Sequence, residues 1–216
     1  MAYDLEEQEK LEALKAWWER YGTLVTTAVV VVALAVAGWS GWRAYQGYRA
    51  NQAMGYFEAL EDAARGIDGP GGADAATRIK AASEMLRNEY AGTAYASRGV
   101  LVAAQALEEK KDYAGAQREL EWLAARKDQS ALRPLASLRL AGLLLDQRQY
   151  DQALAQLNNP PAVFATLFAD RRGDILAAQG KRDDARAAWQ SALVAMPAND
   201  ALKQIIQLKL DALSGA

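Results

Sequence analysis

The chain has 216 residues, with 25 basic against 27 acidic side chains, 51% hydrophobic residues and neither Cys nor His. The lack of Cys and His excludes zinc sites of the usual ligand types, thiolate nucleophiles, disulfides and serine hydrolases with an imidazole base. The near-neutral charge balance gives no basic field to hold phosphates, so we expect no nucleic acid among the partners. The length suits one domain with an appendage.

Residues 21–43 are predicted to form a transmembrane helix in contact with the lipid bilayer. The stretch from Gly22 to Trp42 has 21 residues and no charged side chain. A helix of that length spans roughly 30 Å, the thickness of the hydrocarbon core. A core helix of a soluble protein would show a polar face, which this stretch lacks. Aromatic residues, which prefer the membrane interface, mark both ends: Trp17, Trp18, Trp39 and Trp42.

A cleavable signal peptide is the alternative, because Ala33, Ala35 and Ala37 form steps that a signal peptidase accepts. Residues 1–20, however, contain six acidic and three basic side chains. The leader of a signal peptide is basic, and its apolar stretch is shorter. We therefore predict an uncleaved anchor that follows a short cytoplasmic tail, residues 1–20. Counting the bases near the span favours this orientation only slightly.

Within the span, Ala33, Ala37 and Gly41 recur every four residues and share one helix face. Small residues let another membrane helix approach closely, so this pattern predicts a transmembrane packing face. Alanine is frequent throughout the chain, and a chance recurrence explains the same pattern equally well.

Residues 44–94 are predicted to form a linker helix and a degenerate first hairpin. The segments 50–65 and 74–90 have a helical pattern, and the glycine-rich sequence GIDGPGGAD between them breaks both helices. This loop lacks the Gly-Lys-Ser/Thr ending of a phosphate-binding loop, so we expect a connector.

Residues 95–199 contain an internal repeat. Three sets of five residues have the same offsets of 3, 9, 12 and 16 from their first member, and successive sets are displaced by 37 and then 32 residues. A small residue in each of two antiparallel helices lets them pack closely, which predicts stacked helical hairpins. The three repeat sets are Ala104, Leu107, Tyr113, Ala116 and Leu120; Ala141, Leu144, Tyr150, Ala153 and Leu157; and Gly173, Leu176, Arg182, Ala185 and Trp189.

Residues 200–216 keep helical spacing and suit a C-terminal capping helix.

These residues resemble the tetratricopeptide repeat, most clearly in the segment 171–197. The second repeat departs from the motif, because Pro160 and Pro161 cut its second helix short. The predicted fold class is therefore all-α, with a single N-terminal transmembrane helix followed by a tetratricopeptide-like α-solenoid of helical hairpins. The matching small, aromatic and proline positions are Gly173, Gly180, Ala185, Trp189, Ala192 and Pro197.

Nearly the full length of the chain resembles the bacterial YfgM family, the ancillary subunit of the Sec translocon. The motifs that carry this resemblance are WWERYG (17–22), GWRAY (41–45), LRLA (138–141), RGDIL (172–176) and LKLDAL (208–213). The resemblance implies a single-pass bacterial inner-membrane protein with a cytoplasmic N-terminus and a periplasmic C-terminal domain. It also implies two partners, the Sec translocon (SecYEG) and a membrane-anchored prolyl-isomerase-like (PpiD-like) chaperone.

Tetratricopeptide domains usually bind through the groove lined by the first helix of each repeat. Carried over from the motif, this groove has charged ends and an apolar middle, which suits a peptide from a partner protein. An equally weighted interpretation buries the leucines in the core. The predicted groove residues are Arg98, Leu101, Gln105, Leu135, Leu138, Leu145, Asp170 and Asp174.

Three functions follow from these features. The first is an adaptor that links the translocon to periplasmic chaperones, and the second is a regulator of an envelope stress response that acts through the tail, residues 1–20. The third is an enzyme, which we do not expect, because adjacent carboxylates such as Asp183 and Asp184 point to different helix faces and form no acid-base pair. We expect no cofactor and no metal.

Overall fold

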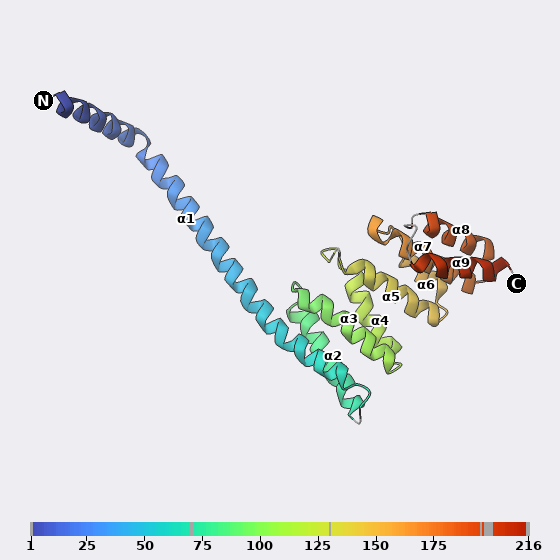
Figure 1. Cartoon of the computed structure of the whole chain (residues 1–216). Coiled ribbons are helices and arrows are strands. Elements are labelled where there is room, and N and C mark those ends of the chain that lie inside the picture. The colour runs from blue at the N-terminus through green and yellow to red at the C-terminus, as the bar shows by residue number, and fades with distance from the viewer. Residues whose placement is uncertain (1, 70, 130, 195, 197–200, 215–216) are drawn as a thin grey trace. The chain divides into compact units, whose positions relative to one another are not determined.

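The computed structural model describes residues 2–69, 71–129, 131–194, 196 and 201–214, and divides the chain into two units, residues 1–51 and 52–216. Its regular elements are helical in the described residues, as predicted from the sequence (Figure 1). The helices are α1 (Ala2–Arg65), α2 (Gly72–Glu89), α3 (Ala94–Glu109), α4 (Tyr113–Ala124), α5 (Arg133–Asp146), α6 (Tyr150–Ala155), the short 3-10 helix η1 (Ala162–Phe164), α7 (Ala165–Ala178), α8 (Arg182–Val194) and α9 (Ala201–Ser214).

The first unit is helical in its described residues, and most of its apolar side chains in the described part are exposed. A window of this part of the chain has a mean hydropathy of 2.0 and is long and apolar enough to cross a membrane. The hydroxyl groups of Thr26 and Thr27 donate to the carbonyl oxygens of Gly22 and Thr23 at 2.8 and 2.7 Å. Both hydroxyl groups therefore have hydrogen-bond partners within the helix, as a lipid environment requires. The exposed aromatic side chains include those expected at the membrane interface, Trp17, Trp18, Trp39 and Trp42.

The predicted transmembrane packing face is also exposed in this unit. Ala33 and Ala37 are exposed, and a Cβ added to Gly41 would meet no described atom within 4 Å. The face is therefore accessible to another helix, and its role in packing stays a prediction.

The second unit is a stack of helical hairpins with three buried apolar clusters. In chain order, α2 packs on α3, α3 on α4, α4 on α5 and α7 on α8, and α9 then packs on α8 (Figure 1). The end of α1 joins the stack, because Leu60 and Ala63 are buried in one cluster with Ile79 of α2 and Ala103 of α3. A central cluster joins α3 to α7, and a third one joins α8 to α9.

The same turn connects the two helices of three hairpins. Lys111, Arg148 and Gly180 have φ angles of 61°, 60° and 80°. In each turn the next residue donates its backbone N–H to a carbonyl oxygen five residues back, at 2.8, 2.8 and 2.9 Å. These positions are displaced by 37 and 32 residues, the same displacements as in the sequence repeat. The structure therefore confirms the predicted register of the hairpins.

The small residues of the repeat lie where the helices meet. Ala104 with Ala116, Ala141 with Ala153, and Gly173 with Ala185 are buried in the three hairpins. The middle hairpin has a short second helix, since α6 ends at Ala155, ahead of the two prolines. Pro197 and the predicted boundary at residues 199 and 200 lie outside the described residues.

Candidate protein-binding surface

The first helices of the hairpins line one surface of the second unit. We call it the first-helix surface, and it is formed by the end of α1 from residue 52 onward, by α3, α5 and α7, and by α9, which follows the last hairpin. Side-chain contacts connect α1 to α3, α3 to α5 and α7 to α9, and α5 packs on α7. The predicted groove residues all lie on α3, α5 and α7.

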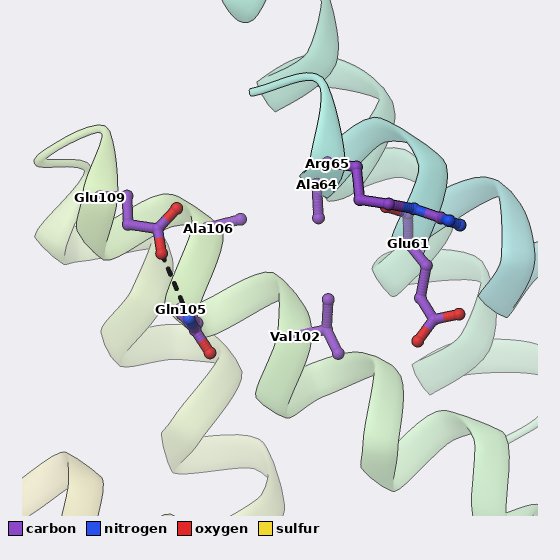
Figure 2. A pocket seen from close by; sticks show the side chains of 7 residues that line it. All are labelled: Glu61, Ala64, Arg65, Val102, Gln105, Ala106 and Glu109. Atoms are coloured by element: carbon purple, nitrogen blue, oxygen red, sulfur yellow. Dashed lines mark hydrogen bonds between the residues drawn. The ribbon is translucent and has the colours of Figure 1, made fainter. Parts of the chain in front are cut away.

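A cleft of about 430 Å³ lies between the end of α1 and α3, and we call it the α1–α3 cleft (Figure 2). Spacings of three and four residues place its lining side chains on one face of each helix. Its apolar residues are small, and its polar ones are two glutamates, a glutamine and an arginine. The lining residues are Glu61, Ala64 and Arg65 of α1, and Val102, Gln105, Ala106 and Glu109 of α3.

Hydrogen bonds engage three of the four polar side chains of this cleft. The Gln105 side-chain amide donates to a carboxylate oxygen of Glu109 at 3.2 Å, the bond drawn in Figure 2. The Arg65 guanidinium donates to a carboxylate oxygen of Asp62 at 2.6 Å. Arg65 is therefore paired within its own helix, with both side chains of the pair exposed to solvent.

Between α3 and α5 the first-helix surface carries Arg139. Its guanidinium donates to the carbonyl oxygen of Leu101 at 3.1 Å and lies 3.8 Å from a carboxylate oxygen of Glu108. Burial raises the pKa of Glu108 above its ordinary value, while the Arg139 charge acts in the opposite direction. The partly buried ion pair thus fixes α5 against α3.

Lys209 of α9 closes the other end of the surface. Its ammonium nitrogen lies 2.7 Å from a carboxylate oxygen of Asp170 and 2.6 Å from one of Asp174. Burial raises the pKa of Asp174, and the hydrogen bond from Lys209 opposes this effect. The sequence placed both aspartates in an open groove, whereas the structure holds them half-buried in ion pairs with the capping helix.

The leucines of the predicted groove do not form an exposed apolar strip. Leu138 is 9% exposed and belongs to the central core cluster, so its assignment to the groove was wrong. The reason is that α5 packs against α4, α6 and α7 at once. Leu101 and Leu145 are half-buried against the same cluster, and only Leu135 of this group is 38% exposed.

Two polar groove residues remain accessible, since Arg98 and Gln105 are exposed on α3. The structure brings Gln105 into the α1–α3 cleft and leaves Arg98 outside its lining. Sequence reasoning missed Glu61, Ala64 and Arg65, which line the cleft opposite the helix of Gln105. It had recognised 50–65 as half of a degenerate hairpin, and extending the groove positions to this helix would have found them.

Stacked hairpins with a small-residue contact in each define a protein of the tetratricopeptide-like α-solenoid class. The sequence model of the family described as "Tetratricopeptide repeat-like domain" matches residues 15–215. A protein of Neisseria gonorrhoeae named ancillary SecYEG translocon subunit is 32% identical over 99% of this chain and 100% of its own length.

Two further relatives with the same name give a consistent picture. The protein of Escherichia coli is 27% identical over 96% of this chain and 97% of its own length, and that of Haemophilus influenzae is 26% identical over 89% and 91%. The chain therefore belongs to the YfgM family of ancillary SecYEG translocon subunits. The shared name describes a translocon subunit and suggests a protein without catalytic activity.

Proposed function

We propose that this protein is a membrane-anchored periplasmic adaptor of the Sec translocon. Its first-helix surface binds partner proteins or emerging chains and links translocation to periplasmic chaperones, among them a membrane-anchored prolyl-isomerase-like one. The observation that carries this proposal is the match over nearly full length to relatives named as translocon subunits. The α1–α3 cleft adds a surface that is accessible to a polypeptide.

The division of the chain into two units suits an adaptor. The apolar helix of the first unit would hold the protein in the plane of the inner membrane, where the translocon also lies. Confinement to the same membrane raises the effective concentration of one partner near the other, so that weak contacts suffice. The hairpin stack would then face the emerging chain from the periplasmic side.

A second function rests on the tail, residues 1–20. The tail is helical in its described residues, and Leu11 and Leu14 are 56% and 60% exposed beside Trp17 and Trp18. This apolar surface supports the alternative of a stress-response regulator whose cytoplasmic tail docks a signalling protein. Deletion of residues 2–12 would abolish such regulation and leave the adaptor role intact.

The natural lack of cysteine allows a direct test of orientation. A single cysteine is introduced as Glu9→Cys in the tail or as Lys127→Cys at an exposed position after α4. In cells with a permeabilised outer membrane, a maleimide that cannot cross the inner membrane should label only the Lys127→Cys protein. Labelling of the Glu9→Cys protein instead would contradict the proposed orientation.

Association is tested by co-purification from cross-linked membranes. The full chain should enrich SecYEG, and a chain without residues 1–43 should lose most of this enrichment, because the anchor no longer holds it at the membrane. Failure of the full chain to enrich the translocon would contradict the adaptor function.

A further inference from the structure

We propose that the α1–α3 cleft is a subsite for one basic side chain, Lys or Arg, of the polypeptide that the protein binds. This proposal rests on the proposed function and names the chemistry that one part of the first-helix surface recognises.

The shape of the cleft suits a long side chain with a charged end. Ala64 of α1 and Val102 and Ala106 of α3 offer small apolar side chains between the two helices (Figure 2). Methylene stems of Lys and Arg pack on such a surface while their charged heads stay near polar groups. The carboxylates of Glu61 and Glu109 are within the same lining, one on each helix.

The lining of the cleft has two carboxylates, of Glu61 and Glu109, and one guanidinium, of Arg65. Arg65 pairs with Asp62 at solvent-exposed positions, and Lys110 beyond the end of α3 lies 3.2 Å from a carboxylate oxygen of Asp68. Gln105 donates a hydrogen bond to Glu109 but brings no positive charge. In the described residues, no ion pair engages the carboxylate of Glu61 or of Glu109.

The end of α3 carries charges of both signs. Its last turn holds Glu108 and Glu109, and Lys110 and Lys111 follow it directly. The cations that a helix end favours are therefore already present there. A Lys or Arg side chain complements the carboxylates of the cleft, whereas an acidic side chain would be repelled.

Peptide binding to the full chain tests the subsite without the translocon. The protein is placed in nanodiscs of phosphatidylcholine, which carry no net charge. The probe is a fluorescein-labelled peptide, Gly-Ser-Arg-Gly-Ser-Arg-Gly-Ser. The comparison peptide has citrulline in place of both arginines. Citrulline keeps the shape of Arg and lacks its charge, and empty nanodiscs give the background.

We expect the arginine peptide to bind about threefold more tightly than the citrulline peptide, because Glu61 is half-buried and Glu109 is exposed, and ion pairs at such positions are weak. The double substitution Glu61→Gln with Glu109→Gln should remove the preference. The control, Glu84→Gln with Glu89→Gln, makes the same change in charge at exposed positions of α2 and should keep it. For the unaltered protein, added salt should weaken binding of the arginine peptide alone.

Equal affinity for the two peptides, or binding of neither, would overturn the subsite, as would a preference that survives the first double substitution. Where the double variant unfolds, the single substitutions Glu61→Gln and Glu109→Gln measure the same preference. Because the translocon is absent from this assay, a negative result overturns the subsite only. The co-purification experiment tests the adaptor function separately. If the full chain fails to enrich SecYEG but keeps its preference for the arginine peptide, the adaptor function fails and the subsite stands.

Discussion

The indole ring of Trp189 lies directly against the backbone of Gly173, so that a Cβ on Gly173 would overlap the ring. The indole N–H also donates to the carbonyl oxygen of Asp170 at 3.1 Å. Trp189 is 4% exposed. This contact fixes α8 against α7 in the last hairpin, and the close approach requires glycine.

Gly173→Ala should therefore lower the free energy of unfolding by about 1–3 kcal/mol, because the added methyl group overpacks the contact. Gly142→Ala is the matched control, since its Cβ would lie 3.6 Å from the Arg171 guanidinium, an ordinary distance. Alanine is the better helix former, so this control should be neutral or stabilising by up to about 1 kcal/mol. Denaturant titration measures both, and equal effects would contradict the packing described.

At two hairpin turns, substitution by glycine should raise the free energy of unfolding. Lys111 and Arg148 adopt left-handed φ angles, which cost L-residues roughly 1–2 kcal/mol, whereas Gly180 has no such cost at the equivalent position. Lys111→Gly and Arg148→Gly should each raise the free energy of unfolding by about 0.5–1 kcal/mol, after the greater entropy of glycine in the unfolded chain is subtracted. Gly180→Ala should lower it by about 1 kcal/mol. Destabilisation by the two glycine substitutions would contradict this expectation.

The burial of Leu138 is tested against a leucine one turn away. Leu138→Ala should cost about 2–4 kcal/mol, because it leaves a cavity in the central cluster. Leu135→Ala, at a 38% exposed position of the same helix, should cost less than about 1 kcal/mol. If both substitutions have the same small effect in thermal unfolding, Leu138 does not belong to the core.

The burial of the Glu119 carboxyl group predicts that the free energy of unfolding depends on pH. The carboxylate is buried on α4, accepts a hydrogen bond from the Ser83 hydroxyl at 2.6 Å and lies 3.2 Å from Nε of Arg87. Burial raises its pKa above the ordinary value of 4.5, despite both partners. A raised carboxyl pKa favours the folded state below the ordinary pKa, and this stabilisation is lost as the pH rises through the raised value.

Glu119→Gln removes this titration and keeps an oxygen for Ser83. The free energy of unfolding of the unaltered protein, relative to the variant, should therefore fall as the pH rises from about 4 to 7. Unfolding of both proteins over this range measures the difference. A difference that is constant with pH would show that Glu119 does not titrate with a raised pKa.

The hairpin register was predictable because it depends on local spacing. Close helix packing needs small residues such as Ala104 and Ala116 at fixed offsets, and the sequence shows those offsets directly. The repeat does not give the direction of the Tyr113 side chain, which begins α4 and is 44% exposed. Its position in the turn is a local property, whereas the direction of its ring depends on neighbouring helices.

The binding surface was less predictable, because exposure depends on which helices meet. Leu135 and Leu138 have the same side chain on one helix, and only the packing of α4, α6 and α7 around α5 separates them. Asp170 and Asp174 similarly acquire a partner, Lys209, from a helix that begins some thirty residues later. Such contacts between distant segments leave no periodic signal in the sequence.

The central claim is that partners of the translocon machinery dock on the first-helix surface, and site-specific photo-cross-linking in living cells tests it most directly. A photo-reactive amino acid is placed at Gln105, in the α1–α3 cleft, and separately at Glu84, an exposed position on α2. Adducts with SecYEG or with its associated chaperone should form from position 105 and be weak or absent from position 84. Adducts that form from position 84 and not from position 105 would contradict the account.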